Sequence, residues 1–372
     1  MKAAYLKERP SIGELGNRLF IDSTLPAPNL DEIKPTEIIV QVKASSINVD
    51  DIHIPEGSFL GGLPFLQSKV PSNDSPIVIG SDFAGIVTGI GSKVDQDKYK
   101  VGQRVCGMNH LQSVYSEMGT WAEFVVTEEK RIVSIPDDLS FTDAAAVVLP
   151  LFVIHGLLEV FEAKMTGKEK IVVIGASGGI GSLLIKMLHK SFNDYNLHIT
   201  GVCSGRNEKF VLGMGADRVV DYTKGPIEID LKGDGMEPTM YDVVFDVVGG
   251  KASYESAKAV LRKGGKFITC VGPLEWIGDD MLSTCAKFSW VGKVMWYSSL
   301  LNLIPGSHPT YYMVAPSELG KTTFDLAFKN KVIPHVDRVV PFDDITRVRE
   351  AIELVRSHRV KGKVVLEIEK TG

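Results

Sequence analysis

The stretch that decides the fold runs from Ile171 to Leu188. It reads Ile171-Val172-Val173-Ile174, then Gly175-Ala176-Ser177-Gly178-Gly179-Ile180-Gly181, then Ser182-Leu183-Leu184-Ile185-Lys186-Met187-Leu188. The β-branched run predicts a buried strand, the glycines a tight turn and the last segment a helix. In this order, the helix N-terminus offers a binding site for the pyrophosphate of a dinucleotide. The stretch therefore predicts a βαβ unit with a phosphate site.

The residues of this turn have separate expected roles. Gly178 and Gly179 let backbone N–H groups approach a pyrophosphate, and Gly181 lets the helix pack closely on the strand. Ala176 stands at the usual first-glycine position. An ordinary strand-helix corner is the alternative reading. We expect the following residues of the loop to bind the cofactor: Ala176, Ser177, Gly178, Gly179, Ile180 and Gly181.

The pattern around this stretch changes near Ser140. Before it, short apolar runs alternate with turn residues, which favours antiparallel strands at 38–42, 83–87 and 121–126. After it, strands alternate with helical patterns, with strands expected at 171–174, 198–203, 243–247 and 267–271. This second pattern is typical of a doubly wound parallel sheet. The last part of the chain predicts helices over 316–329 and 345–357 and strands over 336–340 and 363–368.

Composition excludes several classes of protein. The 372 residues suggest two domains, and 44% hydrophobic with 23% charged residues is typical of a packed globular chain. A net charge of −5 without a run of Lys or Arg argues against nucleic-acid binding. The four cysteines, Cys106, Cys203, Cys270 and Cys285, are widely spaced and form no CxxC pair, which disfavours a disulfide framework. We expect a cytoplasmic protein, since the N-terminus also lacks a signal-peptide pattern.

The end of the second strand of the parallel sheet predicts which dinucleotide binds. A carboxylate there would bond the ribose 2′-hydroxyl of NAD and repel the 2′-phosphate of NADP. The chain instead has Ser204 and Arg206, a hydroxyl and a guanidinium suited to a phosphate, with Tyr222 after the next strand. A solvated loop is the alternative, and Glu208 is a nearby acid. We expect NADPH, held by Ser204, Arg206, Tyr222 and, at the end of a further strand, Val271.

Taken together, these residues resemble the medium-chain dehydrogenase/reductase superfamily, in its zinc-independent quinone oxidoreductase branch. The resemblance covers nearly the whole chain. It rests on the segments 44–51, 80–87, 101–107, 144–150, the loop 178–181, 212–222 and 245–250. The resemblance implies an α/β protein made of a GroES-like β-rich catalytic domain over 1–140 and a Rossmann cofactor domain over 141–316. A segment over 317–372 is expected to return to the catalytic domain.

The resemblance also indicates whether the chain binds zinc. Zinc-dependent relatives carry a cysteine where this chain has Asn48 and a His-Glu pair where it has Ser81-Asp82. Cys106 also lacks the cysteine neighbours of a structural zinc lobe, so tetrahedral nitrogen and sulfur coordination is not available locally. We expect no metal. Without a Lewis acid, hydride addition to a conjugated, already electrophilic acceptor such as a quinone or an enone stays feasible.

Three residues are the catalytic candidates that the resemblance implies. Asn48 would lie beside the nicotinamide and the substrate, and holding a loop is its alternative role. His53 would protonate a developing enolate or quinol oxygen, and a surface histidine is the alternative. His155 stands where relatives usually have a threonine facing the nicotinamide, and a hydrogen-bonded core histidine is equally compatible.

We therefore expect a zinc-independent NADPH-dependent oxidoreductase that reduces a quinone or an α,β-unsaturated carbonyl. A structural or regulatory NADP(H)-binding protein with little turnover is the alternative. The edge strand at 311–314 resembles the dimer edge of relatives, so we expect a homodimer. The apolar insertion over 288–304, and the aromatic residues Trp276, Trp290, Trp296 and Tyr297, would line a lipophilic channel, touch a membrane or pack. The physiological acceptor and the pathway do not follow from the sequence.

Overall fold

The computed structural model describes residues 1–56, 70–109, 119–162, 167–233, 240–271, 310–314 and 318–368. These residues form two compact units. Described residues from 1–149 and 336–368 make up unit 1, and those from 150–271 and 318–335, with 310–314, make up unit 2. The segments 288–304 and 57–69, and the four aromatic residues Trp276, Trp290, Trp296 and Tyr297, lie outside the described residues.

Unit 1 is built on a mostly antiparallel sheet. Its strand order is β15-β16-β3-β5-β6-β8, and β7 also pairs with β3. The strands are β3 (Glu37–Ile47), β5 (Asp82–Ile90), β6 (Arg104–Met108), β7 (Phe124–Glu128), β8 (Ile132–Ser134), β15 (Val336–Pro341) and β16 (Lys363–Glu367). A smaller sheet contains β1 (Ala3–Leu6), β2 (Phe20–Asp22) and β4 (Ile77–Val78). The antiparallel first domain expected from the alternating pattern is confirmed.

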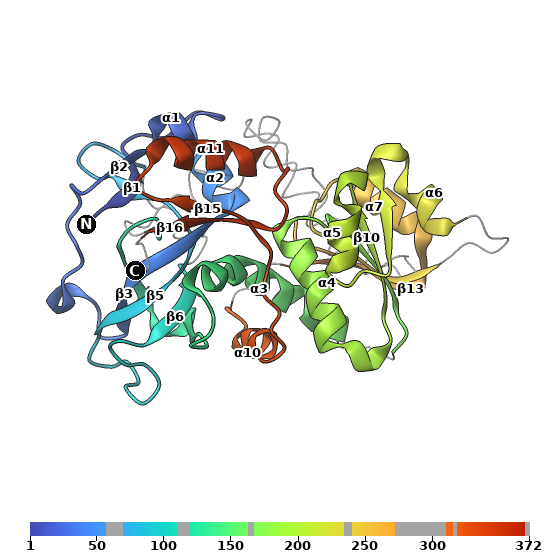
Figure 1. Cartoon of the computed structure of the whole chain (residues 1–372), viewed down its shortest axis with the longest axis horizontal. Coiled ribbons are helices and arrows are strands. Elements are labelled where there is room, and N and C mark those ends of the chain that lie inside the picture. Colours follow the sequence, from blue (N-terminus) through green and yellow to red (C-terminus); the bar gives the residue numbers. More distant parts are fainter. Residues whose placement is uncertain are drawn as a thin grey trace. The chain divides into compact units, whose positions relative to one another are not determined.

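Three helices of unit 1 pack side by side and cover part of its core (Figure 1). They are α1 (Leu15–Arg18), α2 (Val49–Glu56) and α11 (Ile345–Arg356). The alternate residues Ile38, Val40 and Val42 of β3 are fully buried and belong to the same apolar cluster as Val348 and Ile352 of α11. Because strand side chains alternate between faces and helix side chains recur every three or four residues, these two patterns meet in one core.

Unit 2 is a six-stranded, all-parallel sheet in the order β11-β10-β9-β12-β13-β14 (Figure 1). The strands are β9 (Lys170–Ile174), β10 (His198–Cys203), β11 (Arg218–Asp221), β12 (Tyr241–Asp246), β13 (Leu261–Thr269) and β14 (Thr310–Met313). In chain order this arrangement is 3-2-1-4-5-6, the order of the Rossmann fold. The predicted doubly wound sheet is confirmed.

Helices alternate with the strands of unit 2. They are α3 (Phe141–Glu162), which enters from unit 1, α4 (Gly179–Ser191), α5 (Glu208–Gly213), α6 (Ile227–Lys232), α7 (Lys251–Val260) and α10 (Lys321–Lys329). The ring of Tyr254 on α7 packs edge-on against Phe267 of β13 and Tyr311 of β14. By length and composition α3 is apolar enough to cross a membrane, but most of it is buried inside the protein, as is usual for a core helix.

Two predicted boundaries differ from the structure. The unit boundary expected at residues 140 and 141 falls at 149 and 150, inside the continuous helix α3. The return to the first unit begins at Val336 rather than at residue 317. The physical reason is that α10 packs on α4 within unit 2, and the ammonium of Lys186 donates to the carbonyl of Ile333 at 2.7 Å. The return itself is seen in β16, which pairs antiparallel with β3.

Candidate functional site

The phosphate loop lies between β9 and α4, as the sequence predicted. The amides of Gly175 and Ala176 donate to the carbonyl of Val202 on β10, which fixes the start of the loop at the carboxyl edge of the sheet. The N-terminus of α4 begins at Gly179. Because the first N–H groups of a helix have no intrahelical acceptor, those of Gly179, Ile180 and Gly181 are available to an anion.

The glycines of the loop differ in the space around them. A β-carbon at Gly181 would overlap the carbonyl oxygen of Gly175, so helix α4 packs on the loop only if this residue is glycine. Gly175 itself has a φ of +86°, which favours glycine. A β-carbon at Gly178 would meet only the Gly175 oxygen, at 3.6 Å. Gly178 therefore leaves open space at the start of α4, the cradle in which we expect the phosphate of the cofactor.

A second loop follows β10 and carries the predicted 2′-phosphate residues. Ser204 is largely buried at its start, whereas Arg206 is exposed. Tyr222 follows β11 and is 56% exposed, so its ring is accessible to a ligand. Glu208, the acid that the sequence flagged, begins α5 and is exposed. Ser204, Arg206 and Tyr222 thus come from the ends of neighbouring strands on one edge of the sheet.

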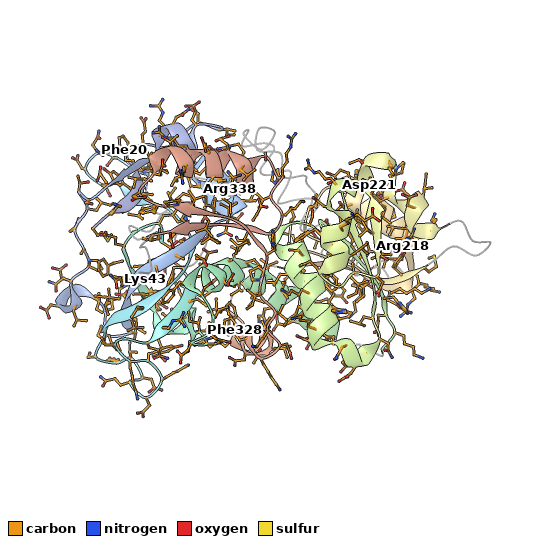
Figure 2. All side chains as sticks on the ribbon, viewed as in Figure 1. Phe20, Lys43, Arg218, Asp221, Phe328 and Arg338 are labelled. Carbon is orange, nitrogen blue, oxygen red and sulfur yellow. The ribbon has the colours of Figure 1, made fainter. Side chains whose placement is uncertain are left out.

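An acid that the sequence reasoning missed lies against this loop. Asp221 ends β11, and Figure 2 labels it with Arg218 at the other end of the strand. Its carboxylate accepts from the hydroxyl of Thr223 at 2.7 Å and from the backbone of Thr223 at 3.0 Å. These bonds, together with one from the Gly205 amide, lower the pKa of Asp221. Its oxygens are therefore engaged with the protein.

The carboxyl ends of β12 and β13 form the neighbouring part of this edge. Asp246, fully buried at the end of β12, accepts from the amides of Val248 and Gly249 at 3.1 and 3.0 Å and from the Thr269 hydroxyl at 3.0 Å. Burial raises its pKa, and these hydrogen bonds act in the opposite direction. Val271 lies two residues beyond β13 rather than within the strand, and its amide donates to Thr269. Asp246 therefore fixes the loop beside the strand-order reversal, where ligands of such sheets bind.

Asn48 lies in unit 1, at the centre of a buried polar network. Its Nδ2 donates to Asp51 at 3.0 Å and to Asp82 at 2.9 Å, and contacts the Ser81 hydroxyl at 3.1 Å. Its Oδ1 accepts from the ammonium of Lys363. The side chain is 2% exposed. Since both ends of the amide are engaged inside the unit, the geometry matches the loop-holding role that the sequence left open.

Charge in this network is unusual for a protein interior. Burial, with the neighbouring Asp82 carboxylate, raises the pKa of Asp51 to about 7. Burial also lowers the pKa of Lys363, and the carboxylates of Asp82, Asp51 and Asp50 oppose that shift. Oδ1 of Asp51 has no hydrogen-bond partner among the described residues. Asp82, which accepts hydrogen bonds from Ser46 and Asn48, is the better stabilised carboxylate beside the Lys363 ammonium, and burial favours the protonated form of Asp51.

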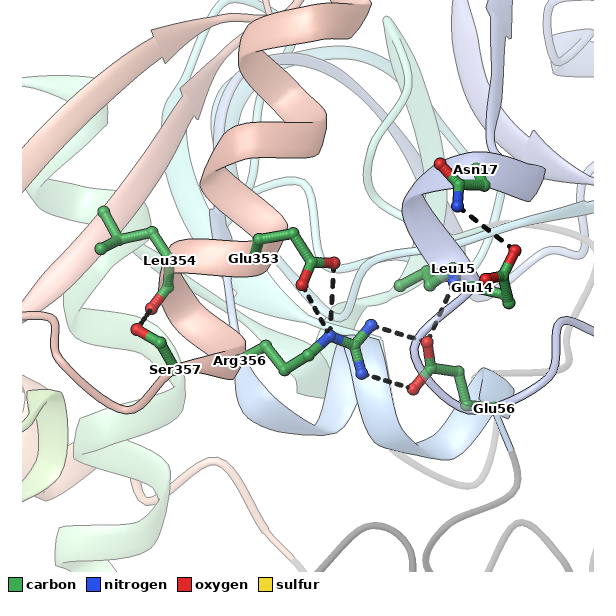
Figure 3. A network of polar contacts seen from close by, with 8 residues as sticks. All are labelled: Glu14, Leu15, Asn17, Glu56, Glu353, Leu354, Arg356 and Ser357. Carbon is green, nitrogen blue, oxygen red and sulfur yellow. Dashed lines mark hydrogen bonds and ion pairs between the residues drawn. The ribbon is translucent and has the colours of Figure 1, made fainter.

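The helix that follows Asn48 is anchored at its far end. Glu56, the last residue of α2, forms a bidentate ion pair with Arg356 of α11 at 2.6 and 2.7 Å (Figure 3). Oε1 of Glu56 also accepts from the amide of Leu15 at 3.0 Å. Glu353 contacts the same guanidinium at 3.3 Å. One buried carboxylate therefore ties α1, α2 and α11 together and fixes the position of α2.

Neither predicted catalytic histidine is an isolated surface residue. His53 is 5% exposed within α2, and its ring stacks near that of His358 with centroids 6.4 Å apart. His155 belongs to unit 2, where its Nδ1 lies 3.0 Å from the Thr323 hydroxyl of α10. A β-carbon at Gly320 would overlap the His155 ring, so α10 holds this ring closely. These contacts fit a hydrogen-bonded packing residue, and a catalytic role for either histidine stays a prediction.

Residues missed from the sequence share one cause. Lys363 is separated from Asn48 by 315 positions. Asp246 is hydrogen-bonded to Thr269 on the neighbouring strand, 23 positions further along the chain. No local sequence pattern therefore predicts either contact. Asp51 and Asp82 lie in the segments 44–51 and 80–87 that carry the family resemblance, but the sequence alone indicates no site role for either of them. Asn207 directly follows Arg206 in the loop expected to bind the 2′-phosphate, and the sequence alone indicates no role for it.

Among the described residues, no group of three or more His, Cys, Asp or Glu is arranged to hold a metal.

Comparisons with known proteins agree with this fold. Residues 34–137 match the family described as "Alcohol dehydrogenase GroES-like domain", and residues 214–366 match "Zinc-binding dehydrogenase". The 2-methylene-furan-3-one reductase of Solanum lycopersicum is 31% identical over 350 residues, which cover 94% of this chain and 75% of the relative. The chain therefore belongs to the medium-chain dehydrogenase/reductase superfamily.

Two further proteins are similar to this chain, one in sequence and one in fold. The chloroplastic NADPH-dependent alkenal/one oxidoreductase of Arabidopsis thaliana is 29% identical over 350 residues, which are 94% of this chain and 75% of that one. The Escherichia coli quinone oxidoreductase solved in complex with NADPH superposes with a TM-score of 0.70 at 20% identity. That match covers 99% of this chain and 100% of the other, and it confirms the predicted fold.

Proposed function

We propose that the chain is an NADPH-dependent oxidoreductase whose acceptor is a quinone or an α,β-unsaturated carbonyl. The observation that carries this proposal is the edge of unit 2. There Gly178 leaves an open cradle at the start of α4, and Ser204 and Arg206 follow the adjacent strand. The names of the tomato and Arabidopsis relatives support an unsaturated carbonyl, and the name of the structural neighbour supports a quinone.

The residues of unit 2 have defined tasks in this proposal. Backbone N–H groups at the start of α4 bind the pyrophosphate, and Ser204, Arg206 and Tyr222 bind the 2′-phosphate. Asp246 holds the loop after β12. When bound, NADPH supplies the hydride, so the protein has to orient the reactants and exclude water rather than generate a nucleophile.

The activity is tested by following NADPH oxidation by the purified chain with a panel of enals, enones and quinones. We expect at least one of these acceptors to be reduced, and NADH to support a slower rate at equal concentration. If NADPH binds and no acceptor is reduced at any pH, the chain is a nucleotide-binding protein with another role. If NADPH does not bind, the proposal is wrong.

We further propose that the reaction needs no zinc. Asn48 and Ser81, which stand where zinc-dependent relatives carry a cysteine and a histidine, hydrogen-bond to each other. The Lys363 ammonium bound to Asn48 would also repel a divalent cation at this place. Exhaustive dialysis against a chelator should leave the rate with the best acceptor unchanged. A loss of activity that added Zn²⁺ restores would contradict this.

Three remaining expectations are proposals of the same kind. The described cysteines Cys106, Cys203 and Cys270 are free thiols, which suits a reducing, cytoplasmic location. β14 ends the parallel sheet and offers an edge for a homodimer, which sedimentation of the full chain would test. Peripheral membrane contact through 288–304 would be tested by flotation with liposomes.

A further inference from the structure

Asn207 joins the two loops of the cofactor site. It ends the short 3-10 turn Gly205–Asn207 between β10 and α5, and its side chain is 5% exposed. Its Nδ2 donates to the hydroxyl of Ser177 at 3.0 Å. Ser177 belongs to the phosphate loop, and Arg206 belongs to the loop expected to bind the 2′-phosphate. The amide of Asn207 therefore stands between the places of the two phosphates.

The other end of this amide is not used by the protein. Oδ1 of Asn207 is buried and has no hydrogen-bond partner among the described residues. The great majority of buried polar atoms in folded proteins are hydrogen-bonded, because a buried acceptor without a donor is costly. An unused acceptor at the edge where a ligand binds indicates that the ligand supplies the donor.

The orientation of the amide follows from what Ser177 has to do. A hydroxyl has one hydrogen to donate, and its oxygen can accept another bond. When Nδ2 of Asn207 donates to this oxygen, the Ser177 hydrogen is left for an anion such as the pyrophosphate. The reversed amide would take that hydrogen and remove a donor from the phosphate loop. Nδ2 therefore faces Ser177, and Oδ1 faces away from it.

The chemistry of NADPH limits which of its groups can donate a hydrogen bond to Oδ1 of Asn207. Its 2′-phosphate and pyrophosphate carry acceptor oxygens at neutral pH, so neither can satisfy Oδ1. The adenosine ribose has one hydroxyl, at the 3′ position, on the ring carbon next to the one that bears the 2′-phosphate. This hydroxyl lies between the two phosphate groups along the ligand, and Asn207 links Ser177 of the phosphate loop to the turn that carries Arg206.

We propose that Asn207 is a ribose-binding residue of the cofactor site, where its Oδ1 accepts a hydrogen bond from the 3′-hydroxyl of the adenosine ribose. Its Nδ2 holds Ser177 so that the Ser177 hydrogen is directed to the pyrophosphate. The inference rests on the NADPH binding proposed above. It adds a ribose contact to the site and explains the buried amide oxygen.

Calorimetric titration with two fragments tests this contact without any catalytic turnover. Adenosine 2′,5′-bisphosphate carries the 3′-hydroxyl, and its 3′-deoxy analogue does not. For the unmodified chain we expect the analogue to bind roughly 3- to 10-fold more weakly, the usual effect of one hydrogen bond. In Asn207→Ala the two fragments should bind equally. Thermal unfolding without ligand checks that the variant folds.

Two further variants make the assignment specific. Arg206→Ala should weaken both fragments by the same factor and preserve the difference between them, since it acts on the 2′-phosphate. Asn207→Asp keeps an acceptor for the 3′-hydroxyl and adds a negative charge beside the phosphates. It should weaken both fragments while the difference between them persists, and it provides a second readout if Asn207→Ala does not fold.

Each other outcome overturns the contact. Equal binding of both fragments to the unmodified chain would mean that Oδ1 is satisfied by water. A difference that persists in Asn207→Ala would assign the 3′-hydroxyl to another residue. If neither the fragments nor NADPH itself binds the unmodified chain, the proposed NADPH binding is wrong, and the inference falls with it.

Discussion

The two polar regions of this protein use their hydrogen-bonding groups in opposite ways. Around Asn48 in unit 1, the amide is saturated by Asp51, Asp82 and Lys363 from three separate elements. At the edge of unit 2, the cradle at Gly178 is open and Oδ1 of Asn207 has no partner in the described part of the chain. An amide such as that of Asn48, with its donor and its acceptor both engaged inside the fold, stabilises the fold. An amide such as that of Asn207, with an acceptor left over at a ligand-binding edge, is available to a ligand. Substitutions should therefore affect folding in the first region and binding in the second.

The largest effect on the free energy of unfolding is expected from Lys363→Met. It removes the ammonium from a buried site and leaves the Asp82 carboxylate uncompensated, which should cost about 3–5 kcal/mol of unfolding free energy. Denaturant unfolding, followed by tryptophan fluorescence and by circular dichroism, measures the loss. Lys361→Met, a partly exposed lysine of the same turn, is the matched control and should change stability by less than about 0.5 kcal/mol. Equal effects of the two variants would show that the charge on Lys363 is not part of the network.

A pair of glycine substitutions separates folding from binding inside the phosphate loop. Gly181→Ala places a β-carbon on the Gly175 carbonyl and should lower the melting temperature, because α4 can no longer pack closely. Gly178→Ala meets only an ordinary contact at 3.6 Å. It should leave the melting temperature of the free protein nearly unchanged and weaken NADPH binding about 10-fold or more, since the methyl group enters the phosphate cradle. If both variants lose only stability, the cradle is not a binding site.

Arg206→Ala addresses the choice between the two nicotinamide cofactors. A charge-assisted bond to a phosphate contributes about 1.5–3 kcal/mol, so NADPH affinity should fall roughly 10- to 100-fold while NADH affinity stays the same. Titration calorimetry with both cofactors measures this. Lys209→Ala, which removes an exposed cation one turn further along, should change neither affinity appreciably. A parallel loss for both cofactors would mean that Arg206 does not contact the 2′-phosphate.

The smallest effect is expected from Asp51→Asn, which should change how the stability of the fold depends on pH. Because the pKa of Asp51 is raised from an ordinary value near 4 to about 7, the folded state keeps a proton that the unfolded state releases. This group stabilises the fold below about pH 4, and its contribution is lost as the pH rises through 7. Asp51→Asn mimics the protonated acid. Relative to the unmodified chain, the variant should gain about 1–2 kcal/mol of stability between pH 5 and 7, measured by denaturant unfolding at each pH. A constant difference across this range would show that Asp51 is ionised throughout.

The elements expected from the sequence agree with the structure where neighbouring residues alone determine the fold. The strand, turn and helix over 171–188 carry their own periodicity and glycine signals, so β9, the loop and α4 were predictable. The strand at 198–203 matches β10 residue for residue. In contrast, the unit boundary lies inside α3, a helix whose apolar pattern continues without a break, and therefore the pattern alone misplaced it.

The candidate site was predictable to a lesser degree, for the same reason. Residue type and strand-end position indicated Ser204 and Arg206, because parallel strands place their carboxyl ends on one edge. The roles of Asn48 and His155 depend on partners far along the chain, Lys363 and Thr323. A side chain's remaining hydrogen-bonding capacity is a property of its three-dimensional neighbours, so neither residue type nor spacing reveals whether an amide is available to a ligand.

The open edge of unit 2 should bind a 2′-phosphorylated dinucleotide. Parallel calorimetric titrations of the unmodified full-length chain with NADPH and with NADH test this binding. We expect one site per chain and an affinity for NADPH at least about 10-fold higher than for NADH, since one charge-assisted contact provides that difference. Equal affinities, or tighter binding of NADH, would contradict the assignment of Ser204 and Arg206 to the 2′-phosphate.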